Sequence, residues 1–261
     1  MTATTHPAAE VIRRAKDKQP TFGFWSVLDA PASNERIARL GYDYVCLDAQ
    51  HGLLGYAGIL QNLMAIDAGH GAAGVVRVGA NDAAAIGRAL DAGARGIIVP
   101  LVNNAAEARA AVAAARYPRA AGTGQRSYGP MRSGLRIGPT PAEADEAVLV
   151  LVMVETAEAL ANLDDICAVE DLDGIYVGPY DLSLGLGGKY PLDPDVQDSL
   201  EDRLKRALTA AEAAGKIAGI HTLDAATARS RAQQGFTFVT VATDLVELEN
   251  AAASQLAEAK A

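Results

Sequence analysis

Short apolar runs alternate with alanine-rich helical patterns along almost the whole chain. Eight runs have the length and composition of buried β-strands, at residues 21–28, 44–48, 74–78, 96–100, 148–155, 174–178, 217–220 and 236–242. Helical patterns accompany them at 55–69, 82–92, 104–116, 195–214, 224–234 and 245–259. Nearly continuous apolar strands separated by helices are typical of a parallel sheet covered on both faces. Eight such strands are the number that forms a (β/α)8 (TIM) barrel.

A doubly wound open sheet is the alternative, but no GxGxxG pattern follows the first strand and the spacing shows no switch point. We therefore predict an α/β chain with a single (β/α)8 domain over residues 1–261. Only residues 117–141 break the rhythm, with many glycines and prolines, four arginines and no clear period. Such a long loop in a compact domain is usually functional or disordered. It follows a helix, so it must fold back to reach the carboxyl ends of the strands.

The charge balance narrows the choice of partners. The chain has 32 acidic and 23 basic residues, a formal net charge of −9. This excess argues against nucleic acid or an anionic membrane as a partner, because both are bound by clustered basic residues. Cys46 and Cys167 occur in or near apolar elements and form no CxxC pattern, so we expect buried free thiols in a reducing compartment. Without an apolar leader or a membrane-length segment, we expect a cytoplasmic protein.

Polar and ionisable side chains gather where the predicted strands end. Active sites of (β/α)8 barrels lie at the carboxyl ends of the strands, so side chains from different strands meet there. The residues at five strand ends are Asp48 with Gln50 and His51, Arg77, Glu155, Asp181 and His221. For His221 we predict no role beyond lining the pocket.

Two of these residues are carboxylates from separate strands. Glu155 and Asp181 suit Mg²⁺ or Mn²⁺, which take oxygen ligands and keep several waters. Each has a purely structural alternative, because acidic residues are common in the first turns of helices. Their combination with an arginine and a histidine favours a metal site.

Arg77 and His51 have the chemistry of catalytic groups. Arg77 lies in an apolar run, where it either pairs with a neighbouring acid or donates to a carbonyl or enolate oxygen. His51 suits a general base, although a satisfied structural histidine is the alternative. Asp48 is close enough in sequence to orient its ring, and Asp91, at the end of a predicted helix, is a less obvious partner.

The remaining motifs exclude other chemistries. The glycine-rich segment 178–188 can present backbone N–H groups to an anion, or it is simply a loop. The GTGQR segment at 122–126 lacks the Lys-Ser/Thr ending of a P-loop, so nucleotide binding has no support. No lysine ends an apolar strand, since Lys189, Lys205 and Lys216 lie in a loop or beside a helix. Schiff-base chemistry is therefore not expected.

A set of motifs resembles the HpcH/HpaI aldolase family, which comprises metal-dependent (class II) pyruvate aldolases of the phosphoenolpyruvate/pyruvate barrel superfamily. The resemblance runs in order from about residue 20 to 245. It is carried by DAQHG (48–52), VVRV (75–78), LDAG (90–93), VPLVNNAAEARAAVAAARYP (99–118), VMVETAEAL (152–160) and DGIYVGPYDLS (173–183). Looser forms of the last two occur in citrate lyase β-subunit and malyl-CoA lyase relatives.

The resemblance implies a role for each matching residue. Glu155 and Asp181 would hold Mg²⁺, Mn²⁺ or Co²⁺, and Arg77 would contact the keto or enolate oxygen of pyruvate. His51 would be the base, working with Asp48 or Asp91. The backbone near Gly178 and Pro179 would receive the pyruvate carboxylate. The resemblance also implies a homo-hexamer in which the last helix packs on a neighbouring subunit.

Two positions depart from the family pattern. Gln50 stands where the family usually has glutamate, and Met153 stands where it usually has glutamine. We expect Gln50 to touch the substrate and both replacements to affect substrate and metal preference. The loop with Gln125, Arg126, Tyr128 and Arg132 replaces the family's usual Arg-Gly segment, and we expect it to face the acceptor aldehyde.

From the residues and the resemblance together, we predict a lyase that reversibly cleaves a 4-hydroxy-2-oxoacid into pyruvate and an aldehyde through a metal-stabilised enolate. A CoA-thioester lyase of the citrate-lyase type is an alternative, because Arg116, Arg119, Arg126, Arg132 and Arg136 are clustered in sequence. An oxaloacetate decarboxylase or a condensing synthase would use the same enolate. A non-catalytic ligand-binding barrel is the alternative outside enzyme chemistry.

Overall fold

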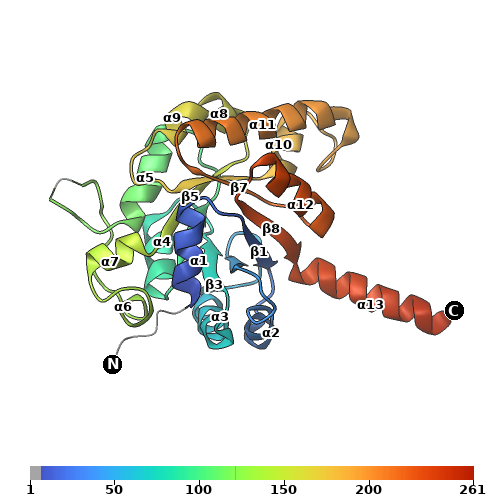
Figure 1. Ribbon diagram of the computed structural model, residues 1–261, viewed down its shortest axis with the longest axis horizontal. Coiled ribbons are helices and arrows are strands. Elements are labelled where there is room, and N and C mark those ends of the chain that lie inside the picture. The colour runs from blue at the N-terminus through green and yellow to red at the C-terminus, as the bar shows by residue number, and fades with distance from the viewer. Residues whose placement is uncertain (1–6, 121) are drawn as a thin grey trace.

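Eight parallel strands close into a barrel in the order in which they occur in the chain. The computed structural model describes residues 7–120 and 122–261. The strands are β1 (Thr21–Ser26), β2 (Tyr44–Asp48), β3 (Ala73–Arg77), β4 (Gly96–Val99), β5 (Leu149–Val154), β6 (Gly174–Val177), β7 (Ile217–Ile220) and β8 (Phe238–Thr243). Figure 1 shows them surrounded by helices. The predicted (β/α)8 barrel is confirmed.

The helices are α1 (Pro7–Lys16), α2 (Pro31–Ile37), α3 (Tyr56–Gly69), α4 (Ala83–Asp91), α5 (Ala105–Ala115), α6 (Ser133–Arg136), α7 (Pro141–Glu146), α8 (Ala157–Ala161), α9 (Leu163–Cys167), α10 (Pro179–Gly185), α11 (Gln197–Ala213), α12 (Ala225–Gln234) and α13 (Asp244–Lys260), with a 3₁₀ turn η1 (Pro194–Val196). The six helices expected from the sequence correspond to α3, α4, α5, α11, α12 and α13. The short helices between strands escaped prediction because one or two turns carry no clear periodicity.

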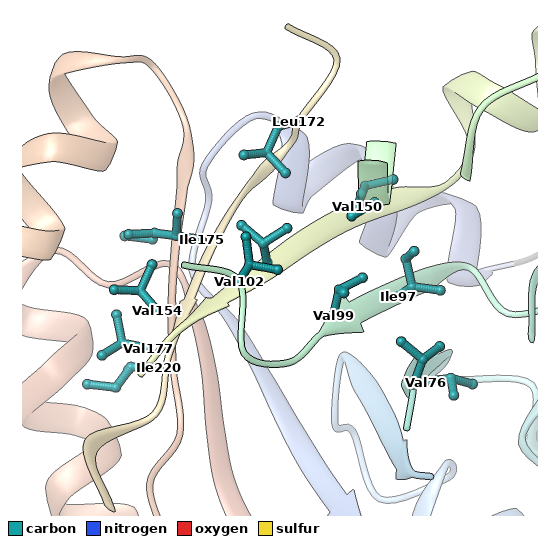
Figure 2. Packing of buried hydrophobic residues seen from close by; sticks show 14 of the residues in the cluster. Val76, Ile97, Val99, Val102, Val150, Val154, Leu172, Ile175, Val177 and Ile220 are labelled. Atoms are coloured by element: carbon teal, nitrogen blue, oxygen red, sulfur yellow. The ribbon is translucent and has the colours of Figure 1, made fainter. Parts of the chain in front are cut away.

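The strands pack against the helices through their outward-facing side chains. Figure 2 shows part of this layer, which includes Val76, Val99, Val150, Ile175 and Val177. All of these side chains are inaccessible to solvent. Such burial on the outer face explains why the strands read as continuous apolar runs in the sequence.

A second apolar layer fills the barrel itself, and α1 closes its amino end. Ala8, Val11, Ile12 and Ala15 of α1 are buried in the same cluster as the inward-facing strand residues. Their spacing is that of one helical face. The sequence analysis assigned no element to this segment, although the stripe was present.

The inward-facing residues follow the two-residue period of a strand. Tyr44 and Cys46 of β2, Ala73 and Val75 of β3, and Leu149, Leu151 and Met153 of β5 all belong to the interior cluster. One further step along these three series reaches Asp48, Arg77 and Glu155. The pleat of the sheet therefore aims three ionisable side chains into the carboxyl end of the barrel, which we call the mouth.

The loop that follows α5 lies at the opposite end. Arg132 of this loop forms a salt bridge with Asp67, near the end of α3. Arg126 forms one with Asp91, the last residue of α4, at 2.6 Å. Since α3 and α4 run back from the mouth, their last residues lie at the amino ends of the strands. The structure contradicts the prediction that this loop reaches the mouth of its own barrel.

The last helix is joined to the end of β1 by its first residue, Asp244, which accepts hydrogen bonds from Ser26 Oγ and from the Val27 and Leu28 N–H groups. α13 projects away from the barrel (Figure 1), and none of its residues is buried. Leu245, Leu248 and Leu256 are among its exposed apolar side chains. In the described part of the chain, no helix combines the length and apolarity that crossing a membrane requires.

Candidate active site

A cavity of about 350 Å³ opens at the mouth. Seven of the eight strands, or the loops that follow them, contribute to its wall. The lining residues are Trp25, Val27, Asp48, His51, Arg77, Met153, Tyr176, Gly178, Tyr180, Asp181, His221, Leu223 and Thr243. Five of the residues predicted at strand ends line this cavity: Asp48, His51, Arg77, Asp181 and His221.

Asp48 and Arg77 form a forked ion pair across neighbouring strands. Arg77 donates from Nε to Asp48 Oδ1 at 2.9 Å and from one Nη to Oδ2. Trp25 Nε1 donates to the same Oδ2 at 3.2 Å, and the backbone N–H groups of Gln50 and His51 donate to Oδ1 at 3.0 and 3.1 Å. Asp48 therefore fixes Arg77 and the following turn, and its carboxylate does not orient the His51 ring.

The electrostatics of this pair keep both side chains charged. Burial alone would raise the pKa of Asp48, but the hydrogen bonds and charge of Arg77 outweigh it and hold the pKa below its usual value. Among the described residues, the other Nη of Arg77 contacts only the sulfur of Met153, at 4.0 Å. The guanidinium also lies 5.1 Å from the centre of the Trp25 ring. One nitrogen of a rigidly held arginine is thus left for a ligand.

His51 stands at the mouth with an uncommitted ring. Its side chain is exposed, and only its backbone N–H makes a hydrogen bond within the described chain. Gln50 is half-buried beside it, and its side-chain oxygen has no hydrogen-bond partner in the part of the chain that the structure describes. Gln50 does not line the cavity, so its predicted contact with substrate has no support in this arrangement.

Glu155 and Asp181 are the two carboxylates that come after β5 and β6, and Asp181 lines the cavity. Glu155 is 3% exposed, and its Oε1 accepts the Leu101 N–H at 2.8 Å. Burial raises the pKa of Glu155, and the nearby charge of Asp181 raises it further. A Cβ at Gly178 would lie 2.9 Å from Glu155 Oε2, so only glycine leaves that oxygen accessible. Leu101 holds its amide in place with a left-handed φ of 53°.

These two carboxylates fit a divalent cation. Glu155 has no cationic partner among residues 7–120 and 122–261, although a buried carboxylate normally has one. Nor do the described residues contain a group of three or more metal-ligating side chains. The chain therefore offers two oxygen ligands and leaves the other positions to substrate and water, the arrangement that Mg²⁺ and Mn²⁺ favour.

His221 has a more defined setting than the sequence suggested. Its Nδ1 lies 3.4 Å from the Tyr176 hydroxyl, which in turn lies 2.5 Å from Thr240 Oγ1. The ring meets Trp25 edge-on at a centroid distance of 4.8 Å. Burial, aided by the charge of Arg77, lowers the pKa of His221 to about 4. The imidazole is therefore neutral near pH 7.

Several lining residues were missed by sequence reasoning. Trp25, Tyr176, Tyr180 and Thr243 were not singled out, because aromatic and threonine side chains in apolar runs read as core. The two-residue period was the usable signal, since Trp25 and Tyr176 are inward-facing residues of their strands. Leu101 had no comparable signal, because its role rests on a backbone N–H.

Asp91 and Arg126 are not brought to this cavity. They pair with each other at the amino end of the barrel, remote from His51. Their predicted roles, as partner of the base and as substrate contact, have no support within one chain. The cavity wall also contains no lysine, in keeping with the expectation against a Schiff base.

The fold and the cavity define a (β/α)8 enzyme that acts on a small molecule at the carboxyl ends of its strands. Residues 21–251 match the HpcH/HpaI aldolase/citrate lyase family, and the chain belongs to this family. As the sequence resemblance implied, it is a carbon–carbon lyase.

Relatives of known name support the assignment. The chain is 41% identical over 245 residues to a hydroxypyruvate/pyruvate aldolase of Rhizorhabdus wittichii, covering 93% of this chain and 95% of the relative. It is 37% identical over 240 residues to a 4-hydroxy-2-oxo-heptane-1,7-dioate aldolase of Salmonella dublin, covering 91% and 89%. A crystal structure of an HpcH/HpaI aldolase/citrate lyase family protein from Burkholderia cenocepacia superimposes with a TM-score of 0.87 at 31% identity, covering 97% and 100%.

Proposed function

We propose that the chain is a class II pyruvate aldolase that reversibly cleaves a 4-hydroxy-2-oxoacid into pyruvate and an aldehyde. The observation that carries the proposal is the mouth itself, where the rigid Arg77 lies near two carboxylates that form no salt bridge within the described residues. Relatives at 37–41% identity are named as aldolases of this kind. The HpcH/HpaI family is generally dependent on a divalent metal.

We assign Glu155 and Asp181 as ligands of Mg²⁺, Mn²⁺ or Co²⁺. Such an ion would polarise the 2-oxo group as a Lewis acid and stabilise negative charge on its oxygen. Support comes from the burial that raises the pKa of Glu155, and from the lack of a salt bridge to its carboxylate among the described residues. Gly178 contributes by leaving Oε2 uncovered.

The pyruvate half of the substrate is proposed to lie between Arg77 and the start of α10. Pro179 has no N–H, and the N–H of Gly178 donates to Val154 O at 3.3 Å. The amides left over in the first turn are those of Tyr180 and Asp181, and they suit the substrate carboxylate. The uncommitted Nη of Arg77 suits the 2-oxo oxygen.

His51 is proposed as the base. It takes the proton of the C4 hydroxyl, directly or through a water, because its exposed ring is free to do so. The C3–C4 bond then breaks, C4 becomes the aldehyde carbon, and the bonding electrons form the pyruvate enolate. Arg77 donates to the enolate oxygen, and protonation at C3 gives pyruvate. Asp48 serves by holding Arg77 in position.

The test compares retro-aldol cleavage with the alternative reactions, thioester cleavage and oxaloacetate decarboxylation. The protein, with Mn²⁺ or after EDTA treatment, is offered a 4-hydroxy-2-oxoacid, a malyl-CoA thioester and oxaloacetate, and pyruvate, aldehyde and free CoA are measured. We expect metal-dependent release of pyruvate and aldehyde in equal amounts. Release of CoA from the thioester alone, or no reaction at all, would reject the proposal in favour of the lyase or the binding barrel.

The CoA alternative loses its structural basis. Arg116 forms a salt bridge with Asp173 at 2.6 Å, and Arg119 forms one with Asp171 at 2.8 Å. Arg126 and Arg132 are paired at the amino end, as described above. These arginines are thus paired with carboxylates of the same chain. They form no basic patch for CoA phosphates at the mouth of the described chain.

For assembly and location we propose a cytoplasmic homo-hexamer with pyruvate and an aldehyde as small-molecule partners, and with neither nucleic acid nor membrane. Buried free Cys46 and Cys167 suit a reducing compartment. The exposed leucines of α13 suit packing on a neighbouring subunit. Light scattering of the full chain tests this, because a monomer would contradict it.

A further inference from the structure

The cavity wall divides into a charged half and a neutral half. Asp48, His51, Arg77 and Asp181 follow strands β2, β3 and β6, with Glu155 beside them after β5. Strands β7, β8 and β1 close the ring on the other side, and from them come His221, Leu223, Thr243, Trp25 and Val27. Among the described residues, no side chain with a permanent charge lines this second half. An acidic 2-oxoacid belongs to the first half, which leaves the second for the aldehyde.

His221 is the most polar group of the neutral half, and its ring is fixed. Trp25 and Tyr180 meet it edge-on at centroid distances of 4.8 and 6.0 Å, and Tyr176 engages its Nδ1. The Tyr176 hydroxyl is itself hydrogen-bonded to Thr240, which restricts rotation of that hydroxyl. With Nδ1 engaged, Nε2 is the nitrogen left to interact with a molecule in the cavity.

Thr243 supplies a second uncommitted polar group nearby. It is 7% exposed, lines the same cavity, and its Oγ1 has no hydrogen-bond partner in the described chain. A buried hydroxyl without a partner is uncommon in a native structure. Two unmet hydrogen-bonding groups in an otherwise apolar half-pocket indicate a ligand that is itself polar there.

We propose that His221 is a specificity-determining residue that hydrogen-bonds a hydroxyl group of the acceptor aldehyde through Nε2, with Thr243 beside it. The inference rests on the proposed aldolase function and names its acceptor class: a short hydroxyaldehyde. A neutral imidazole has one donor and one acceptor, which matches a hydroxyl group. The lowered pKa of His221 supports a neutral partner, since a carboxylate there would favour the protonated ring.

The inference separates a hydroxyaldehyde from the acceptor that one relative's name implies. Cleavage of a 4-hydroxy-2-oxo-heptane-1,7-dioate yields an aldehyde with a distal carboxylate, for which this half of the cavity offers no cation. A hydroxyaldehyde needs only hydrogen bonds. The chain is therefore expected to prefer the hydroxyaldehyde.

The experiment compares glycolaldehyde with propanal, which has a methyl group in place of the hydroxyl, as acceptors for pyruvate. Variants are His221→Gln and His221→Asn, because the glutamine amide reaches the place of Nε2 whereas the asparagine amide reaches only that of Nδ1. The effect of aldehyde hydration cancels when the kcat/KM of each variant is divided by that of wild type on the same substrate. Deuterium exchange of the pyruvate methyl protons in D₂O with Mn²⁺ reports the charged half separately.

We expect His221→Asn to lower kcat/KM for glycolaldehyde by about 10-fold, the effect of one hydrogen bond, and to leave propanal within about twofold. His221→Gln should retain most of the preference, and Thr243→Val should lose part of it. Exchange should be unchanged in all three. Equal losses on both aldehydes, no loss in His221→Asn, or a fall in exchange would overturn the role of His221. Absence of exchange in wild type would instead reject the aldolase itself.

Discussion

The two ends of the barrel carry charge in different ways. At the amino end, arginines and carboxylates satisfy one another: Arg132 pairs with Asp67, and Arg126 pairs with Asp91. At the mouth, several ionisable groups lack a full set of partners within the described chain. In the described chain, Glu155 forms no salt bridge, the His51 ring makes no hydrogen bond, and one Nη of Arg77 contacts only a thioether.

This difference separates structural from functional charge. Where ion pairs are complete, removing one partner should weaken the fold and leave the chemistry alone. Where groups are left over, removing one should weaken the chemistry and leave the fold alone. The variants below test this division.

The largest effect on activity is expected from Glu155→Gln. The amide keeps an oxygen for the Leu101 N–H but removes the charge that would hold the cation, so retro-aldol activity should fall by about 1,000-fold. The unfolding temperature should stay constant or rise, because a buried charge beside Asp181 is lost. Glu158→Gln on the exposed face of α8 is the matched control. Lowered stability with retained activity would break the comparison.

Arg77→Lys should follow, with a fall in kcat of about 100-fold. A lysine cannot hold Asp48 through a fork and still offer a second donor to the enolate oxygen. Steady-state kinetics on the aldol substrate measures the effect on catalysis, and unfolding monitored in parallel measures the effect on stability. Near-normal kcat would show that a point charge suffices and that the forked geometry is irrelevant.

At the amino end, Asp67→Asn should behave in the opposite way. It breaks the salt bridge to Arg132 and leaves that cation half-satisfied, so the free energy of unfolding should fall by about 3 kcal/mol. Denaturant unfolding measures the loss, and kcat per folded molecule should match wild type. A large loss of kcat would mean that the two ends are not independent.

The smallest effect concerns pH. His221 faces Arg77 and Asp48 across the cavity, with Tyr176 and Tyr180 against its ring, and its pKa lies near 4. Because the ring stays neutral above that value, the ratio of kcat/KM for glycolaldehyde over propanal should stay constant from about pH 6 to about pH 9. A change in this ratio centred near pH 6.5 would show that the histidine titrates normally.

The barrel and most residues of the mouth could be predicted from the sequence, because both depend on local periodicity. Alternation along a strand predicts which side chains point inward, and Asp48, Arg77 and Glu155 follow from it directly. The errors concern segments without a period. Residues 117–141 have no pattern that shows at which end of the barrel they lie.

Asp91 illustrates a signal that was available and unused. A helix after a barrel strand runs back toward the amino end, so its last residue cannot reach the mouth of the same chain. The setting of His221 could not be predicted in the same way. Its fixed ring depends on Tyr176, Thr240 and Trp25, which come from three other strands.

The central claim is that the mouth converts pyruvate into its enolate, with His51 moving the proton. Deuterium exchange of the pyruvate methyl group, followed by NMR with and without Mn²⁺, tests it without knowledge of the aldehyde. Wild type should exchange only with the metal, His51→Ala should lose exchange, and added imidazole should restore part of it in the space that the exposed ring vacates. Metal-independent exchange, or full exchange in His51→Ala, would contradict the account.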